Sequence, residues 1–156
     1  MKPQRGFTLI DLVVVVIILA VLSAIALPKF INLGVEARVA AVTSLSGGIR
    51  SAANMAYAGC LINGDPSMQN QFGVSIGTTP TTVHYCWLDA GDGLNAGQID
   101  SWVTYTGFTA SLVDTTHTRF SLDGAPDPVN CSVTYEDAFN RGQALGMGLV
   151  QTTTGC

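Results

Sequence analysis

The chain has 156 residues, of which 47% are hydrophobic and only 12% are charged, and its formal net charge is −4. This length is enough for one domain with a hydrophobic core. Beyond residue 50 there are nine acidic residues and two arginines, so that part of the chain carries a net charge of −7. Such a surface repels phosphate, and we therefore expect no nucleic-acid partner.

The first predicted element is an apolar stretch from Phe7 to Leu27 that contains a single charge, Asp11. As a helix it would be about 30 Å long, which is enough to cross the hydrocarbon core of a bilayer. A secretory signal peptide would have a shorter apolar core followed by a small-residue cleavage site. Lys2 and Arg5 precede the stretch, which predicts a cytoplasmic N-terminus and places the rest of the chain outside the membrane.

A specific motif stands at the start of this stretch. A basic leader ends in Gly, and an aromatic residue, Thr, Leu, an aliphatic residue and an acid follow, with a Pro 21 residues after the aromatic. These positions are Gly6, Phe7, Thr8, Leu9, Ile10, Asp11 and Pro28. The chain therefore resembles a type IV prepilin, although the family usually has Glu where this chain has Asp11. The stretch "ALPKFINLGVEARVAAVTSLSGGIRSA" is similar to the mannose-sensitive haemagglutinin (MSHA) branch of pilins in particular, and "VNCSVTYEDA" and "TTTGC" are similar to it less specifically.

The resemblance implies a filament subunit rather than an enzyme, and no cofactor is expected. A prepilin peptidase would remove the leader, residues 1–6, by cutting between Gly6 and Phe7, and would methylate the new amine of Phe7. Residues 7–28 would form the helix that lies in the bacterial inner membrane and later, with the help of the inner-membrane assembly machinery, in the core of an extracellular homopolymer. Asp11 would pair with the amine of a neighbouring Phe7 and so favour one axial register.

Beyond the apolar stretch, small and apolar residues recur at close to the helical period, which predicts an amphipathic continuation of the helix over residues 29–59. Pro28 lacks an amide donor and crowds the carbonyl of Ala24, so we expect a kink near Pro28. Gly59 is the expected end of the helix.

Residues 60–156 are predicted to form a β-rich head domain, because short β-like runs alternate there with Gly, Thr, Asp, Asn and Pro. The candidate strands are Val83–Leu88, Ser101–Thr106, Phe108–Val113, Arg119–Leu122, Cys131–Tyr135 and Leu145–Thr152. Their alternation predicts an antiparallel sheet with one face on the helix. The expected fold class is therefore α+β, with a long N-terminal helix whose C-terminal half packs on an antiparallel sheet, as in the pilin fold.

The four cysteines, Cys60, Cys86, Cys131 and Cys156, fit an oxidising compartment and allow three pairings. We favour Cys60–Cys86 with Cys131–Cys156. The second pair resembles the disulfide that closes the C-terminal loop of many pilins, and the first would tie the helix end to the first long strand. A zinc site at the cysteines is disfavoured, because there is no CxxC and no close His/Cys pair.

The stretch from Asp89 to Asp100 is the one candidate for a metal site. Asp89, Asp92 and Asp100 could supply oxygen ligands to calcium, and the related secretion pseudopilins carry a calcium loop. The spacing does not match an EF-hand loop, and an ordinary Gly/Asp turn is the preferred interpretation. His84 and His117 are expected to be surface strand residues, because nothing marks a nucleophile with its base.

Two other functions compete with that of a pilin. A pseudopilin of a type II secretion system has the same N-terminal motif, but the two C-terminal cysteines favour the pilin. A membrane-anchored periplasmic enzyme or binding protein would need a pocket with convergent polar groups, and it would leave Gly6, Phe7 and Asp11 unexplained.

Overall fold

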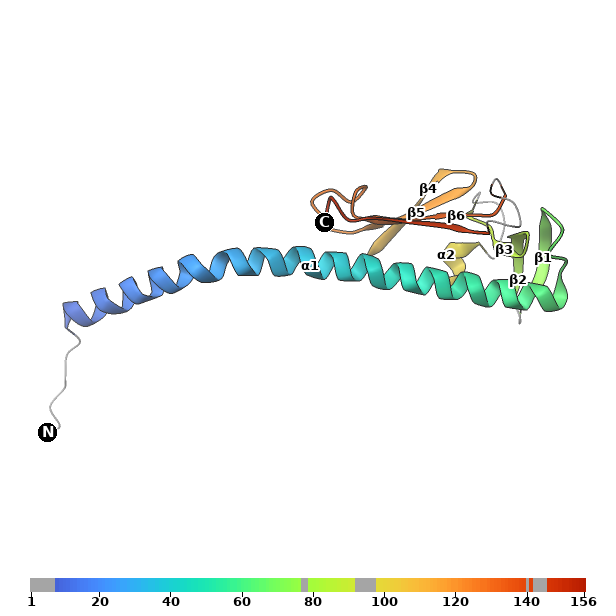
Figure 1. Cartoon of the computed structure of the whole chain (residues 1–156). Coiled ribbons are helices and arrows are strands. Elements are labelled where there is room, and N and C mark those ends of the chain that lie inside the picture. The colour runs from blue at the N-terminus through green and yellow to red at the C-terminus, as the bar shows by residue number, and fades with distance from the viewer. Residues whose placement is uncertain (1–7, 77–78, 92–97, 140, 142–145) are drawn as a thin grey trace, which may run out of the picture. The chain divides into compact units, whose positions relative to one another are not determined.

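The computed structural model describes residues 8–76, 79–91, 98–139, 141 and 146–156, apart from the side chains of residues 28–32, 72, 73, 76 and 79. The chain divides into two compact units, Met1–Ala37 and Arg38–Cys156. The long helix α1 (Leu9–Asn63) contributes to both units (Figure 1).

Helix α1 confirms the predicted long N-terminal helix, but the predicted end at Gly59 is wrong. The helix continues to Asn63, and the amide of Gly64 then donates to the carbonyl oxygen of Cys60 at 2.6 Å. The last turn stays helical because Cys60 is fully buried and bonded, which outweighs the weak helix propensity of one glycine. The kink expected at Pro28 falls where the side chains lie outside the described residues, and it stays a prediction.

The strands of the second unit form two antiparallel sheets instead of the single sheet expected. The three-stranded sheet has the order β1 (Gln71–Ile76), β2 (Thr79–His84) and β3 (Trp87–Leu88). The four-stranded sheet has the order β4 (Phe108–Asp114), β5 (His117–Leu122), β6 (Ser132–Glu136) and β7 (Gly148–Thr152). In the second sheet each strand pairs with the next one in the chain, so this sheet is a simple meander.

Four of the six predicted strands are found with small shifts of their ends, namely those that became β4, β5, β6 and β7, although Leu145 lies outside the described residues. The predicted strand Val83–Leu88 is wrong as a single strand, because Tyr85 and Cys86 adopt positive φ values of 51° and 67° and turn the chain between β2 and β3. The strand predicted at Ser101–Thr106 is also wrong. The short helix α2 (Ile99–Trp102) covers the first two residues of that stretch instead, and its Ile99 and Trp102, three residues apart, pack in the core.

The core of the second unit lies between α1 and the two sheets. Val42, Ile49 and Ala53 come from the helix, and Val83 and Phe120 come from the sheets, and all five are fully buried. In Figure 1 the strands of the four-stranded sheet run alongside this part of α1. The packing confirms the α+β architecture expected from the sequence.

Candidate functional site

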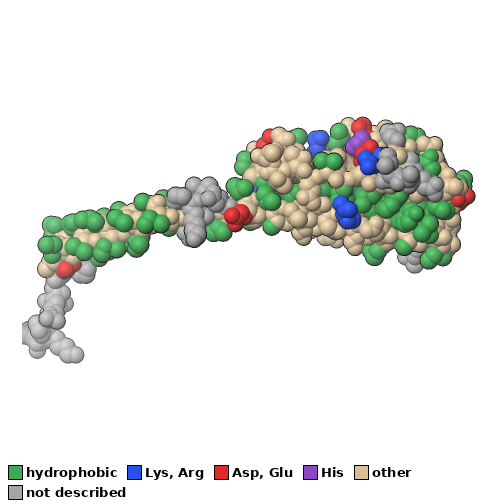
Figure 2. All heavy atoms as spheres, viewed as in Figure 1, with side chains coloured by type: hydrophobic (Ala, Val, Ile, Leu, Met, Phe, Trp, Pro, Cys, Tyr) green, Lys and Arg blue, Asp and Glu red, His purple; other side chains and the backbone are tan. Residues whose placement is uncertain are grey.

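Among the described residues of the first unit, the start of α1 has an exposed apolar surface. From Leu9 to Leu27 the mean hydropathy is 3.1 and none of the segment is buried, and by length and composition it could cross a membrane. Figure 2 shows hydrophobic side chains along this segment. An apolar surface of this size is unfavourable in water. We therefore expect lipid or another apolar surface to cover it.

Thr8 and Asp11 form a reciprocal cap at the start of α1. The backbone amide of Thr8 donates to Asp11 Oδ2 at 3.1 Å, and the Thr8 hydroxyl donates to the same oxygen. In return, the amide of Asp11 donates to Thr8 Oγ1 at 3.4 Å. This is the arrangement of a capping box with Asp in place of Glu, and it satisfies donors that the first turn leaves without a helical partner. The cleavage site predicted at Gly6 and Phe7 lies outside the described residues.

The two disulfides have the predicted pairing. Cys60 bonds Cys86 with the Cα atoms 5.4 Å apart, and Cys131 bonds Cys156 with the Cα atoms 4.8 Å apart. The first joins the last turns of α1 to the turn between β2 and β3. The second joins the start of β6 to the C-terminal residue.

The C-terminal loop is held by close backbone contacts as well as by its disulfide. Gly155 donates to the carbonyl oxygen of Asn130 at 2.9 Å and accepts from the amide of Asp127 at 3.1 Å. A Cβ atom on Gly155 would lie 2.6 Å from the Asp127 carbonyl oxygen, so only glycine fits here. Arg38, on α1, donates from its guanidinium to the carbonyl oxygen of Cys156 at 2.7 Å. The end of the chain is therefore attached to the helix.

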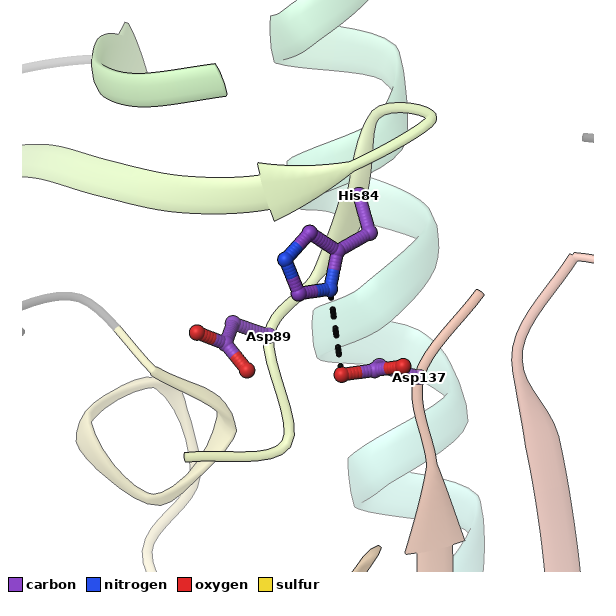
Figure 3. Close-up of side chains that lie close together, drawn as sticks. All are labelled: His84, Asp89 and Asp137. Atoms are coloured by element: carbon purple, nitrogen blue, oxygen red, sulfur yellow. Dashed lines mark hydrogen bonds and ion pairs between the residues drawn. The ribbon is translucent and has the colours of Figure 1, made fainter. Parts of the chain in front are cut away.

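A cluster of His84, Asp89 and Asp137 lies inside the second unit. His84 ends β2, Asp89 follows β3 and Asp137 follows β6, and the three side chains point toward one another (Figure 3). Each residue is less than 10% exposed, and one ligand atom from each lies within 4.8 Å of the others. His84 Nδ1 is 3.1 Å from Asp137 Oδ2. The expectation that His84 lies on the surface is wrong, because the turn at Tyr85 and Cys86 directs it inward.

Backbone amides and aromatic rings surround this cluster. Asp137 Oδ1 accepts from the amide of Phe139 at 2.8 Å, and the Phe139 ring lies 5.1 Å from the His84 ring. The buried Tyr135 hydroxyl donates to the carbonyl oxygen of Leu88 at 2.6 Å. Burial, together with the negative charges of Asp137 and Asp89, raises the pKa of the Tyr135 phenol well above its usual value.

The three predicted calcium ligands do not form one group in the described residues. Asp89 belongs to the buried cluster, Asp100 is exposed on α2, and Asp92 lies outside the described residues. Sequence reasoning missed Asp137, which is 48 positions from Asp89. No local spacing could indicate it, because the strand pairing alone brings it close.

His117 belongs to a second, more exposed group. Its Nδ1 is 2.8 Å from Asp114 Oδ1, and its Nε2 is 3.8 Å from Glu136 Oε1. The hydrogen bond with His117 holds the pKa of the Asp114 carboxyl low, at about 2. Arg141 pairs with the other Glu136 oxygen at 2.9 Å. His117 lies on strand β5 and is partly exposed, as predicted from the sequence.

Comparison with known proteins defines the class of the N-terminal segment. Residues 1–27 match the prokaryotic N-terminal methylation motif. The match includes the exposed apolar segment Leu9–Leu27 at the start of α1.

Particular relatives are type IV fimbrial proteins. The chain is 41% identical over 61 residues to the type IV major fimbrial protein FimA of Dichelobacter nodosus, which covers 39% of this chain and 36% of that protein. It is 44% identical over 48 residues to the type IV narrow pilus major component PilA5 of Thermus thermophilus. This match covers 31% of this chain and 41% of that protein. It is 39% identical over 56 residues to a fimbrial protein of Pseudomonas aeruginosa, covering 36% of each. The chain thus spans well under half the length of these relatives, and no solved structure matches it significantly.

Proposed function

We propose that this protein is a structural subunit of a type IV pilus. The observation that carries the proposal is the methylation motif over residues 1–27, which includes the helix segment Leu9–Leu27 of mean hydropathy 3.1, and none of that segment is buried. Such a helix is stable in a bilayer, and it is equally stable against copies of itself. The relatives named as pilus or fimbrial components support the same assignment.

The proposed sequence of events begins in the bacterial inner membrane. Lys2 and Arg5 hold the uncut N-terminus on the cytoplasmic side, and the peptidase then removes residues 1–6. The cut leaves a new amine on Phe7, which directly precedes Thr8 in the sequence. In the filament, Asp11 of one subunit pairs with the amine of the next, because two unpaired charges in an apolar core are unfavourable. The assembled polymer is extracellular and serves attachment or motility.

The placement in the MSHA branch is a finer proposal. It rests on the sequence after the methylation motif and on the C-terminal residues quoted above. The two disulfides, and the loop that Cys131–Cys156 closes, are compatible with it.

The pilin is preferred to a membrane-anchored binding protein because such a protein would leave the methylation motif unexplained. Among the described residues, one hollow of the second unit is lined by small, apolar and hydroxyl side chains. It has a volume of about 380 Å³ and lies beside α1 and the segment before β4. Its lining residues are Ala41, Ser44, Leu45, Gly48, Val103, Thr104, Tyr105, Thr106 and Phe108.

The test is to isolate surface filaments from the source cells and to identify their protein by intact mass and N-terminal fragmentation. We expect a filament protein that begins at N-methylated Phe7, and cells without the gene should lack these filaments. A mature protein that keeps Met1–Gly6, or one found only in a short periplasmic assembly of a secretion system, would refute the proposal. The second outcome would favour the pseudopilin.

A further inference from the structure

The buried cluster of His84, Asp89 and Asp137 has the composition of a transition-metal site. It offers one imidazole nitrogen and two carboxylates from three residues that are each less than 10% exposed, with one ligand atom of each within 4.8 Å of the others. We propose that His84, Asp89 and Asp137 bind one first-row divalent cation, of which zinc is the best match, inside the second unit. This inference is independent of the proposed filament role.

The geometry of the cluster is close to what such an ion needs. Zinc bonds to nitrogen and carboxylate oxygen are about 2.0–2.2 Å long, so neighbouring ligand atoms lie about 3–4 Å apart. His84 Nδ1 and Asp137 Oδ2, at 3.1 Å, already have this separation. A movement of about 1 Å brings Asp89 into the same range. Three protein ligands leave a fourth position of a tetrahedral site for water or another ligand.

Backbone amides donate hydrogen bonds to the two carboxylates and so hold their orientation. Asp137 Oδ1 accepts from the amide of Phe139 at 2.8 Å, while its Oδ2 faces His84. Asp89 Oδ1 accepts from the amide of Gly91 at 3.1 Å. Hydrogen bonds of this kind orient ligating carboxylates in known metal sites and reduce the entropy lost on metal binding. The Phe139 ring, 5.1 Å from the His84 ring, restricts the imidazole in the same way.

Charge and ligand type indicate which cation fits. Two carboxylates this close repel each other when both are ionised. A divalent cation compensates both and leaves His84 neutral, which is the form that ligates metals. Calcium and magnesium prefer oxygen ligands only, whereas an imidazole nitrogen beside carboxylates suits zinc and its neighbours in the first row. Metal ligands must be deprotonated, so we expect binding to release protons.

A bound ion would connect three strand ends that are far apart in the sequence. His84 belongs to the three-stranded sheet, Asp137 follows β6 of the four-stranded sheet, and Asp89 lies in the chain between the two sheets. The ion would therefore stabilise the second unit by linking the sheets, since it binds the folded state only.

The experiment uses the full-length protein in detergent micelles, freed of metal with a chelator and then titrated with ZnCl₂ at pH 7.5. We expect one equivalent of Zn²⁺ to bind with release of protons and to raise the melting temperature. Titration with Co²⁺ should saturate at the same stoichiometry and show the visible absorption of a tetrahedral site. CaCl₂ at the same concentrations should have no effect on the melting temperature.

The variants are His84→Gln and Asp89→Asn, with His117→Gln as the matched control on the partly exposed histidine group. Both cluster variants should lose affinity for Zn²⁺ by more than about 100-fold, and His117→Gln should bind like the wild type. If the cluster variants fail to fold, the Co²⁺ spectrum and the stoichiometry of the wild type decide. The proposal is overturned if the wild type binds no Zn²⁺, if binding is lost in His117→Gln and kept in His84→Gln, or if the Co²⁺ spectrum is that of a fully hydrated ion.

Discussion

Removing each disulfide in turn measures how much the cross-links contribute to the stability of the second unit. Cys131 and Cys156 are 25 residues apart, and Cys60 and Cys86 are 26 residues apart. In the chain-entropy model, a cross-link across a loop of this length stabilises the folded state by about 3.5 kcal/mol at 25 °C. The two bonds therefore should contribute equally, although one joins a helix to a turn and the other joins a strand to the C-terminus.

The change is a double alanine substitution of each pair. Alanine is preferred to serine, because Cys60, Cys86 and Cys131 are fully buried and a hydroxyl there would be desolvated. Each pair also loses the packing of two sulfur atoms, and this loss is similar for the two variants. The variant that lacks one disulfide is thus the matched control for the variant that lacks the other.

The assay is urea unfolding of the full-length protein in detergent micelles, followed by the fluorescence of Trp87 and Trp102, which both lie in the second unit. We expect the free energy of unfolding to fall by about 3–4 kcal/mol in each variant, with similar slopes. Reduction of the wild type should lower it further, because both bonds are then broken. A loss below about 1 kcal/mol in either variant, or a difference above about 2 kcal/mol between them, would refute the entropic reasoning.

Three further predictions concern single side chains. Asp11→Ala should be processed and inserted yet assemble poorly, and Asp11→Glu should assemble at least as well as the wild type; normal filament yield from Asp11→Ala would show that the charge has no part in assembly. Tyr135→Phe should lose about 1–3 kcal/mol of unfolding free energy at pH 7, because the Leu88 carbonyl loses its donor. The folded-state pKa of Tyr135 is raised above the usual 10.0, so the contribution of its neutral phenol to the unfolding free energy is complete below pH 10 and falls above it. In urea titrations at alkaline pH, the wild type should therefore lose more stability than Tyr135→Phe. Gly155→Ala should destabilise by about 1–3 kcal/mol through the contact with Asp127, whereas Gly47→Ala, with nothing within 4 Å of the new Cβ, should be neutral or stabilising in the same assay.

The N-terminal part of the molecule could be predicted from sequence because its determinants are local. The apolar run, the single Asp11 and the leader lie within 28 consecutive residues, and helix formation depends on neighbours a few positions apart. The β4–β5 hairpin and β6 were found for the same reason, since alternation over five or six residues indicates a strand. Sequence reasoning missed β1, because Gly73 and Pro80 interrupt the pattern of the β1–β2 pair.

The buried cluster could not be predicted, because its members meet only through tertiary structure. The sequence around His84 is typical of a continuous strand. Only the positive φ values at Tyr85 and Cys86 reveal the turn that directs the His84 side chain inward. Such values are rare for residues other than glycine, so no sequence rule indicates them. Asp137 follows an ordinary strand, and only the tertiary structure brings it to 3.1 Å from His84.

Attachments of the head to α1 near both ends of the packed helix segment have a mechanical consequence. Arg38 holds the C-terminal carbonyl near one end of the packed helix segment, and the Cys60–Cys86 bond holds the other end, about 33 Å away along the helix at 1.5 Å per residue. A pull that separates the head from the helix at one end only could peel the apolar contacts apart one after another, which takes little force. With both ends held, the load is shared by all contacts between Val42 and Ala56 at once, so the interface must shear as a whole. We expect a subunit built in this way to keep its fold under tension as long as Cys60–Cys86 is intact, and to extend at lower force once that bond is reduced.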